Sequence, residues 1–235
     1  MYENANEMTL ARAQQEASTV FLAKVFNWMA VGLGITGVVA FLTAQTGLAA
    51  MIVGSPLFFV IIFAELGLVF YLSARIQKIQ ASTASSLFVG YSVLNGLTFS
   101  VIFLAYTGSS IAGTFMITAG MFGAMAVYGL VTKKDLSGWG SFLFMGLVGI
   151  ILASIVNIFL QNSSLYWVIS LIGVFLFTAL TAYDVQKIKR IGEEGIMTQG
   201  EDAIAKGSIM GALTLYLDFI NLFLMLLRFF GGSRN

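Results

Sequence analysis

The chain has 235 residues, of which 58% are hydrophobic and only 10% are charged, and its net charge is +1. Soluble domains are closer to 25% charged, and the mean hydropathy of +0.91 exceeds what one soluble core can hide. We therefore expect a polytopic membrane protein whose main partner is the lipid bilayer. The near-neutral charge excludes the basic surface of a nucleic-acid-binding protein.

Cysteine and histidine are both absent from the sequence. Their absence excludes disulfides, iron–sulfur clusters and cysteine zinc sites, and it removes the usual side chain that titrates near neutral pH. No cofactor is expected. Any response to pH near neutrality must come from carboxyl groups whose pKa is raised by burial or by sharing a proton.

The first 20 residues, MYENANEMTLARAQQEASTV, mix acids, bases and amides. They lack the apolar core and small-residue cleavage site of a secretory signal, so the first apolar helix is expected to direct insertion. We predict a cytoplasmic N-terminal segment over 1–25, a transmembrane domain over 26–231 and a short C-terminal tail over 232–235.

Helices that cross a bilayer need about 20 apolar residues. Their alternative, a β-barrel, needs strands with alternating polarity, which these runs lack. The sequence therefore predicts an all-α protein with seven transmembrane helices. The seven apolar stretches are 26–46, 51–74, 84–106, 110–132, 139–160, 165–187 and 207–229.

Basic residues occur on alternate loops, which predicts the orientation. The loops QTG, TGSS and QNSS contain no charge, and the side that holds most of the basic residues is normally the cytoplasm. We therefore expect a cytoplasmic N-terminus. Arg228 and Arg234 would return to that side only if the seventh stretch were re-entrant, and we expect it to span. Ten of the twelve basic residues share the predicted cytoplasmic side: Arg12, Lys24, Arg75, Lys78, Lys133, Lys134, Lys187, Lys189, Arg190 and Lys206.

Two aspartates stand in or beside the last two apolar stretches, Asp184 in FLFTALTAYDVQKIKR and Asp218 in GALTLYLDFINLFLMLLRFFG. An ionised carboxylate in hydrocarbon costs at least about 2.5–3.5 kcal/mol, so each must be paired, protonated or hydrated. Helical spacing places Asp184 on one face of the sixth stretch with two threonines. A polar stripe of the seventh stretch is expected to face the bundle interior: Gly207, Gly211, Thr214, Asp218, Asn221, Met225 and Arg228.

These two faces could bring Asp184 and Asp218 together. Two nearby carboxyl groups in a low dielectric share one proton, which would make the pair a pH sensor. The alternative is two separate polar residues that hold helices together by hydrogen bonds. Their expected depths in the membrane argue against a contact between the two aspartates. Asp184 lies close to the cytoplasmic Lys187, whereas Asp218 is about 16 Å inside its stretch.

Glu65, in FFVIIFAELGLVFYL, is a third acid within an apolar stretch. Two interpretations remain open, an acidic residue that lines an ion pathway and a protonated carboxyl group bonded to a neighbouring helix. Arg75 ends the same stretch. It is either an anchor whose charge reaches the interface or a latch that pairs with one of the two aspartates.

The seventh stretch, ALTLYLDFINLFLMLLRFFG (212–231), resembles the C-terminal signature of the Bax inhibitor-1 family. TAYDVQKIK (181–189) is similar to the sixth-helix motif of that family, and KKDLSGWG (133–140) resembles its fourth-to-fifth loop. The resemblance covers essentially residues 20–231.

This resemblance implies a fold in which six helices surround a central seventh, and a pH-sensitive calcium leak. The family's aspartate pair falls on Asp184 and Asp218, where a calcium ion could also be held, and its second-helix acid on Glu65. Its latch arginine falls near Arg75, about one residue from the family position. The lysine-rich tail of eukaryotic members is absent, which implies a bacterial inner-membrane protein.

Calcium ions and protons are thus the expected small partners, with Glu65, Asp218 and Asn221 on the ion pathway. A non-conducting regulator that contacts another membrane protein through its helices is the alternative. An intramembrane aspartyl protease is a further one, but YLD at 216–218 lacks the GxGD context of that class, so no enzyme activity is expected.

Overall fold

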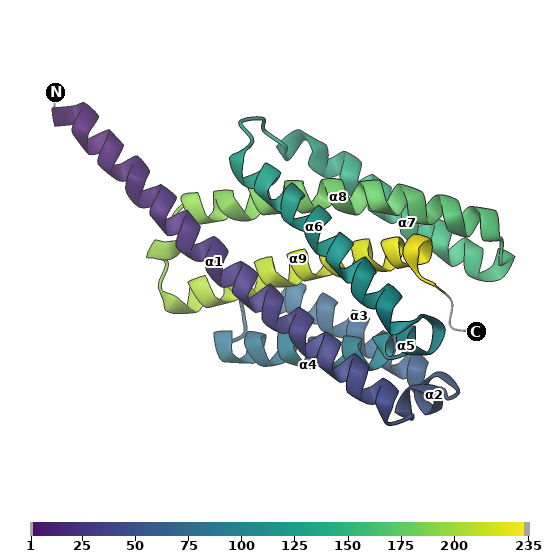
Figure 1. Ribbon diagram of the computed structural model, residues 1–235. Helices are drawn as coiled ribbons and strands as arrows, with labels where there is room; N and C mark the ends of the chain where they lie inside the picture. Colours follow the sequence, from purple (N-terminus) through teal and green to yellow (C-terminus); the bar gives the residue numbers. More distant parts are fainter. Residues whose placement is uncertain (1, 233–235) are drawn as a thin grey trace. The chain divides into compact units, whose positions relative to one another are not determined.

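The computed structural model describes residues 2–232, with side chains from residue 13 onward. Every regular element in that part of the chain is helical (Figure 1). Seven helices are long and apolar enough to cross a membrane, so the seven-helix prediction is confirmed. They are formed by α1 (Tyr2–Gln45), α3 (Leu57–Arg75), α4 and α5 (Ala81–Phe99 and Ile102–Ala105), α6 (Gly108–Val131), η1 and α7 (Ser137–Trp139 and Gly140–Leu160), α8 (Ser163–Glu193) and α9 (Glu201–Phe230).

The helix α9 is the most buried of the seven. Of the 18 consecutive residues that form the most apolar part of α9, 72% are buried. The corresponding share is 11–44% in the other six helices. This burial is in keeping with a central seventh helix, an arrangement that stays a prediction.

The first helix starts far earlier than its apolar stretch. It begins at Tyr2 rather than near residue 26, because Glu, Ala, Gln and Arg are good helix formers even where they are too polar to enter a membrane. The predicted boundary at residue 25 therefore falls inside a helix, and the cytoplasmic position of 1–25 stays a prediction. Residues 233–235 of the predicted tail, with Arg234, lie outside the described residues.

The second stretch is broken near its start. A short helix, α2 (Leu48–Val53), precedes α3, and Gly54, Ser55 and Pro56 separate them. Pro56 stands at the N-cap of α3, where the lack of an N–H group costs nothing.

The sixth and seventh helices extend well beyond their apolar stretches. Of residues 188–206, which separate the last two apolar stretches, only those between Glu193 and Glu201 lie outside the two helices, and they include η2 (Ile196–Thr198). Ion pairs between residues four apart stabilise the extra turns: Lys189 with Glu193 at 3.7 Å, and Lys206 with Asp202 at 2.6 Å.

The chain divides into two compact units, and each is described by itself. Unit 1 contains the residues up to Ala105 together with Ile188–Tyr216, and unit 2 contains Tyr106–Lys187 together with the chain from Leu217 onward. Both α8 and α9 therefore contribute one part to each unit.

In unit 1, α1 packs closely along α4 at two glycines. A Cβ atom on Gly96 would lie 2.6 Å from Val39, and one on Gly32 would lie 2.7 Å from the ring of Phe88. The Thr36 hydroxyl joins the same two helices, since it donates to the Ser92 carbonyl oxygen over 2.9 Å.

Candidate functional site

Asp184 and Asp218 lie together in unit 2, one on α8 and the other on α9. Their residues are only 8% and 5% exposed, and a side-chain hydrogen bond joins the two carboxyl groups. An ionised carboxylate only accepts hydrogen bonds, so this bond requires a proton on one of the two groups. The structure thus brings the two predicted residues together, and their role as a proton sensor stays a prediction.

The length of α8 removes the difficulty over depth. Asp184 lies nine residues before Glu193, the last residue of the helix, which is about 14 Å at the helical rise. Asp218 lies 17 residues after Glu201, the first residue of α9. Both aspartates are therefore well inside their helices. The difficulty arose because the apolar stretch, and not the helix, ends near Lys187.

Close helix contacts hold α8 in place within unit 2. A Cβ atom on Gly129 of α6 would clash with the carbonyl oxygen of Ala182. The Tyr183 hydroxyl lies 2.5 Å from the position of a Cβ atom on Gly140, at the start of α7. The first contact involves the backbone of α8 two residues before Asp184, and the second involves the side-chain end of its neighbour Tyr183, so α8 packs closely against α6 and α7 beside Asp184.

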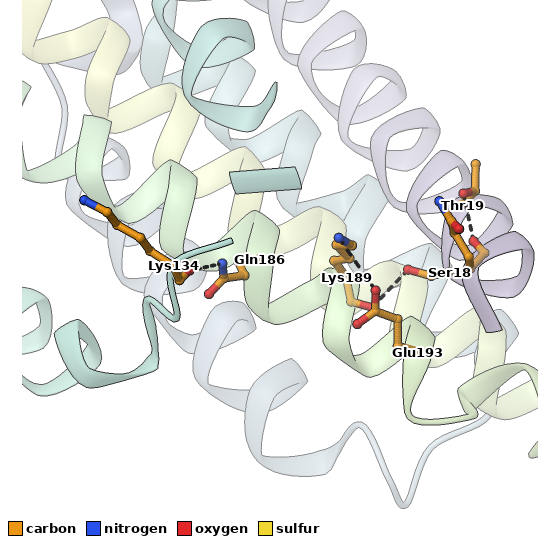
Figure 2. Close-up of polar contacts among 7 residues, drawn as sticks. Ser18, Thr19, Lys134, Gln186, Lys189 and Glu193 are labelled. Atoms are coloured by element: carbon orange, nitrogen blue, oxygen red, sulfur yellow. Dashed lines mark hydrogen bonds and ion pairs between the residues drawn. The ribbon is translucent and has the colours of Figure 1, made fainter. Parts of the chain in front are cut away.

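Gln186 attaches the loop between α6 and α7 to α8. Its side-chain oxygen accepts from the Leu136 N–H at 2.8 Å, and its side-chain nitrogen donates to the Lys134 carbonyl oxygen at 2.9 Å. Figure 2 shows the second of these bonds. The motifs TAYDVQKIK and KKDLSGWG, which lie far apart in the sequence, therefore contact each other directly. Sequence reasoning missed Gln186, since nothing in the sequence indicates which loop its amide would meet.

The same loop also contains a local side-chain bond. Asp135 accepts a hydrogen bond from the Ser137 N–H at 2.8 Å, which forms an Asx turn just before the 3₁₀ turn η1. The helix α7 begins only at Gly140, after this turn.

A second set of contacts anchors the last turns of α8 within unit 1. The Ser18 hydroxyl donates to the Lys189 carbonyl oxygen at 3.0 Å, beside the Lys189–Glu193 ion pair (Figure 2). A Cβ atom on Gly192 would lie 2.8 Å from Ser18. The polar end of α8 is thus packed against α1, which explains why it stays helical.

Few polar groups compensate the buried pair. Lys187, one turn after Asp184, is close enough to interact with it electrostatically. The Oδ2 atom of Asp218 is buried and accepts no hydrogen bond from the described residues. Its neighbour in the chain, Phe219, packs on the rings of Phe115 and Phe122, at centroid distances of 5.3 and 5.5 Å. Such surroundings favour a pair that carries at most one negative charge.

The threonines that share the polar stripes with the two aspartates do not donate hydrogen bonds to them. The hydroxyl groups of Thr178, Thr181 and Thr214 all donate to carbonyl oxygens of their own helices. Burial does not single out the stripe of α9 either, because Leu215 and Leu222, which lie off the stripe, are fully buried.

Asn221 is half-buried on α9, and its amide nitrogen donates to the Leu217 carbonyl oxygen at 2.8 Å. That bond leaves its side-chain oxygen available as an ion ligand. Its place on an ion pathway stays a prediction.

Glu65 lies in unit 1, half-buried in the middle of α3. The Thr98 hydroxyl of α4 donates to its Oε1 atom at 2.5 Å. Glu65 thus accepts a hydrogen bond from a neighbouring helix, and both of its interpretations, a residue of an ion pathway and a protonated carboxyl group, stay predictions. Buried close by, the hydroxyl groups of Tyr216 and Thr36 are hydrogen-bonded at 2.7 Å.

Arg75 is the last residue of α3 and is exposed. It belongs to unit 1, whereas the aspartates belong to unit 2. A latch between them stays a prediction.

Among the side chains that the structure describes, no three Asp or Glu residues gather into a group that could hold a metal ion. Calcium normally takes six to eight oxygen ligands, and the pair of Asp184 and Asp218 provides at most four. The pair alone therefore provides fewer ligands than a calcium ion normally takes, and a calcium ion held there stays a prediction.

Comparison with known proteins gives one consistent result. The family model described as inhibitor of apoptosis-promoting Bax1 matches residues 18–235, and this family is not known to be enzymatic. The inner membrane protein YbhL of Escherichia coli K12 is 53% identical over 216 residues, which cover 91% of this chain and 92% of that protein.

Two proteins without an assigned role are also similar. The relative in Deinococcus radiodurans is 46% identical over 228 residues, which cover 97% of this chain and 96% of that protein. The relative in Borreliella burgdorferi is 49% identical over 218 residues, 92% of this chain and 93% of that protein. With seven helices suited to crossing a membrane, the chain is an integral inner-membrane protein that belongs to the Bax inhibitor-1 family.

Proposed function

We propose that this protein is a pH-sensitive calcium leak channel in which the Asp184–Asp218 pair senses protons. The observation that supports this most is the hydrogen bond between two buried carboxyl groups from different helices. Removal of the shared proton would leave two negative charges side by side in a low dielectric. Their repulsion would favour a second packing of α8 and α9, so protonation would shift the population between two states.

Calcium would pass as a transported ion. Calcium binds carboxylate and amide oxygens in flexible geometries, and such groups are provided by Glu65, Asp218 and Asn221. A leak requires weak sites that release the ion again, and the small number of acidic groups in the described spans supports weak binding.

The experiment is calcium flux into vesicles that contain the purified full-length protein and a trapped calcium indicator. Flux is measured over a series of pH values for the native protein and for the double variant Asp184→Asn/Asp218→Asn. We expect the variant to lose the pH dependence, because amide groups do not titrate. Asp202→Asn is the matched control, since Asp202 is exposed and pairs with Lys206 at 2.6 Å in the first turn of α9.

Unchanged flux and an unchanged pH profile in the double variant would disprove the sensor. No flux from the native protein at any pH would instead favour the alternative function, a non-conducting regulator that acts on another membrane protein through its helices.

A further inference from the structure

A cavity of about 530 Å³ opens in unit 2 where α7 ends and α8 begins. It lies between the last turns of α7, the first turn of α8 and the last turns of α9. The side chains that matter for its chemistry are Asn157, Asn162, Ser163, Tyr166 and Arg228. None of these residues belongs to the aspartate pair or its surroundings.

Arg228 is the charged residue of this lining. Its guanidinium group lies over the Tyr166 ring, 4.3 Å from the centroid, and its Nη1 atom donates to the Ser170 hydroxyl at 3.2 Å. No carboxylate of the described residues pairs with it. A guanidinium group has five N–H donors, so most of its donors remain available while the ring and the serine hold its plane in one orientation.

Two asparagines add further donors. The side-chain oxygen of Asn157 accepts from the Asn162 N–H, and that of Asn162 accepts from the Leu165 N–H, both at 3.0 Å. Each oxygen is therefore occupied by a backbone donor, and each amide NH₂ group is left without a partner among the described residues. These NH₂ groups can only donate.

The start of α8 strengthens the positive potential. Ser163 is the first residue of this 31-residue helix, whose first turn contains no acidic residue. The first N–H groups of a helix lack partners within the helix, and the helix dipole is positive at this end. The cavity thus combines one cation, several free donors and a helix N-terminus, with no carboxylate in its lining.

We propose that this cavity binds a phosphate group, namely that of a membrane phospholipid. Arginine with several convergent N–H donors is the usual partner of phosphate oxygens. The cavity lies at the ends of two spanning helices, the level at which lipid headgroups and aromatic side chains such as Tyr166 are found. Beside it, Ile158, Phe159 and Leu160 expose apolar side chains (68%, 83% and 62%), which would contact the acyl chains.

The test is titration calorimetry on the full-length protein in a neutral maltoside detergent, with three probes. Dihexanoylphosphatidylglycerol has the phosphate and the acyl chains, dihexanoylglycerol has the chains alone, and inorganic phosphate has the anion alone. We expect the first to bind at least about tenfold more tightly than the second, because charge-assisted hydrogen bonds are the strong ones. Tight binding of inorganic phosphate with no gain from the chains would contradict the lipid as the source.

Two variants test the residues. Arg228→Gln removes the charge, and Asn162→Asp keeps the oxygen that caps Leu165 while it replaces the NH₂ donors by a negative charge. Each is expected to weaken dihexanoylphosphatidylglycerol binding about tenfold or more and to leave dihexanoylglycerol binding unchanged. The control is Lys133→Gln, an exposed cation of the same unit that precedes α7, about 30 Å along that helix from the cavity.

The proposal is wrong if the phosphate-bearing lipid binds no better than dihexanoylglycerol. It is equally wrong if Asn162→Asp, folded as judged by a native melting temperature, binds the phosphate-bearing lipid as tightly as the Lys133→Gln control does. Neither result bears on calcium flux, so this proposal and the proposed channel function can fail separately.

Discussion

The carboxyl groups of Asp184 and Asp218 are hydrogen-bonded to each other inside unit 2. The bond links α8 to α9, and Oδ2 of Asp218 has no partner of its own among the described residues. A proton shared by the two groups, as we propose, would make this link sensitive to pH. The residues around it serve mainly to position the two helices.

Replacement of one aspartate should preserve the bond and end the sharing of one proton between two acids. In Asp184→Asn the amide can donate to Asp218, whose carboxyl group then titrates alone. We expect the midpoint of the pH profile of calcium flux to move, with the melting temperature changed by less than it is in Asp184→Leu, which leaves Asp218 buried without a partner. A native pH profile in Asp184→Asn would exclude Asp184 as the sensor.

The contact between Gly129 and Ala182 should be intolerant of any side chain. Gly129→Ala is expected to lower the free energy of unfolding by about 1–3 kcal/mol, because the new methyl group must push α6 away from α8. The measurement is thermal unfolding in detergent. Gly123→Ala on the same helix is the control, since its Cβ atom would meet nothing within 4 Å. Equal melting temperatures for the two variants would mean that this close approach does not exist.

Loss of the Gln186 amide should release the loop between α6 and α7. Gln186→Leu leaves the Leu136 N–H and the Lys134 carbonyl oxygen without their partner, which costs about 1–3 kcal/mol for each group that stays buried. Hydrogen exchange of the loop amides, followed by mass spectrometry, should accelerate. The exposed Gln199 provides the control Gln199→Leu, and equal exchange in the two variants would contradict the attachment.

The bond between Thr98 and Glu65 should stabilise unit 1. Thr98→Val keeps the shape of the side chain and removes the donor, so we expect a loss of about 1–3 kcal/mol in the free energy of unfolding, whereas Thr98→Ser should restore most of it. Thr19→Val is the control, because the exposed Thr19 hydroxyl donates only to Gln15 of its own helix, at 2.9 Å. If Thr98→Val unfolds at the same temperature as the native protein, the bond between Thr98 and Glu65 does not stabilise unit 1.

Hydropathy predicted the seven helices because an apolar run of sufficient length is a local property of the chain. It misplaced the ends of α1, α8 and α9, since hydropathy reports where a helix can meet lipid and not where helical geometry stops. The polar turns beyond Lys187 are helical because Lys189 pairs with Glu193 and Gly192 packs on Ser18. Only the first of these contacts is local in sequence.

The acidic residues of the candidate site could be predicted from the sequence, but the contacts that position them could not. A carboxyl group inside an apolar stretch is conspicuous in any sequence, which is why Asp184, Asp218 and Glu65 were found. The contacts of Gln186 with Lys134 and of Gly129 with Ala182 depend on which surfaces meet after folding, and no local pattern contains that information.

The central claim, one proton shared between Asp184 and Asp218, is tested most directly by infrared difference spectroscopy of the protonated carboxyl band. As the pH rises, the native protein should lose one such band, and calcium flux should change over the same pH range. In Asp184→Asn and in Asp218→Asn the band should shift in frequency and titrate over a different pH range, the double variant Asp184→Asn/Asp218→Asn should lack it, and Asp202→Asn should keep it. A band that is unchanged in both single variants, or that titrates without any change in flux, would contradict the account.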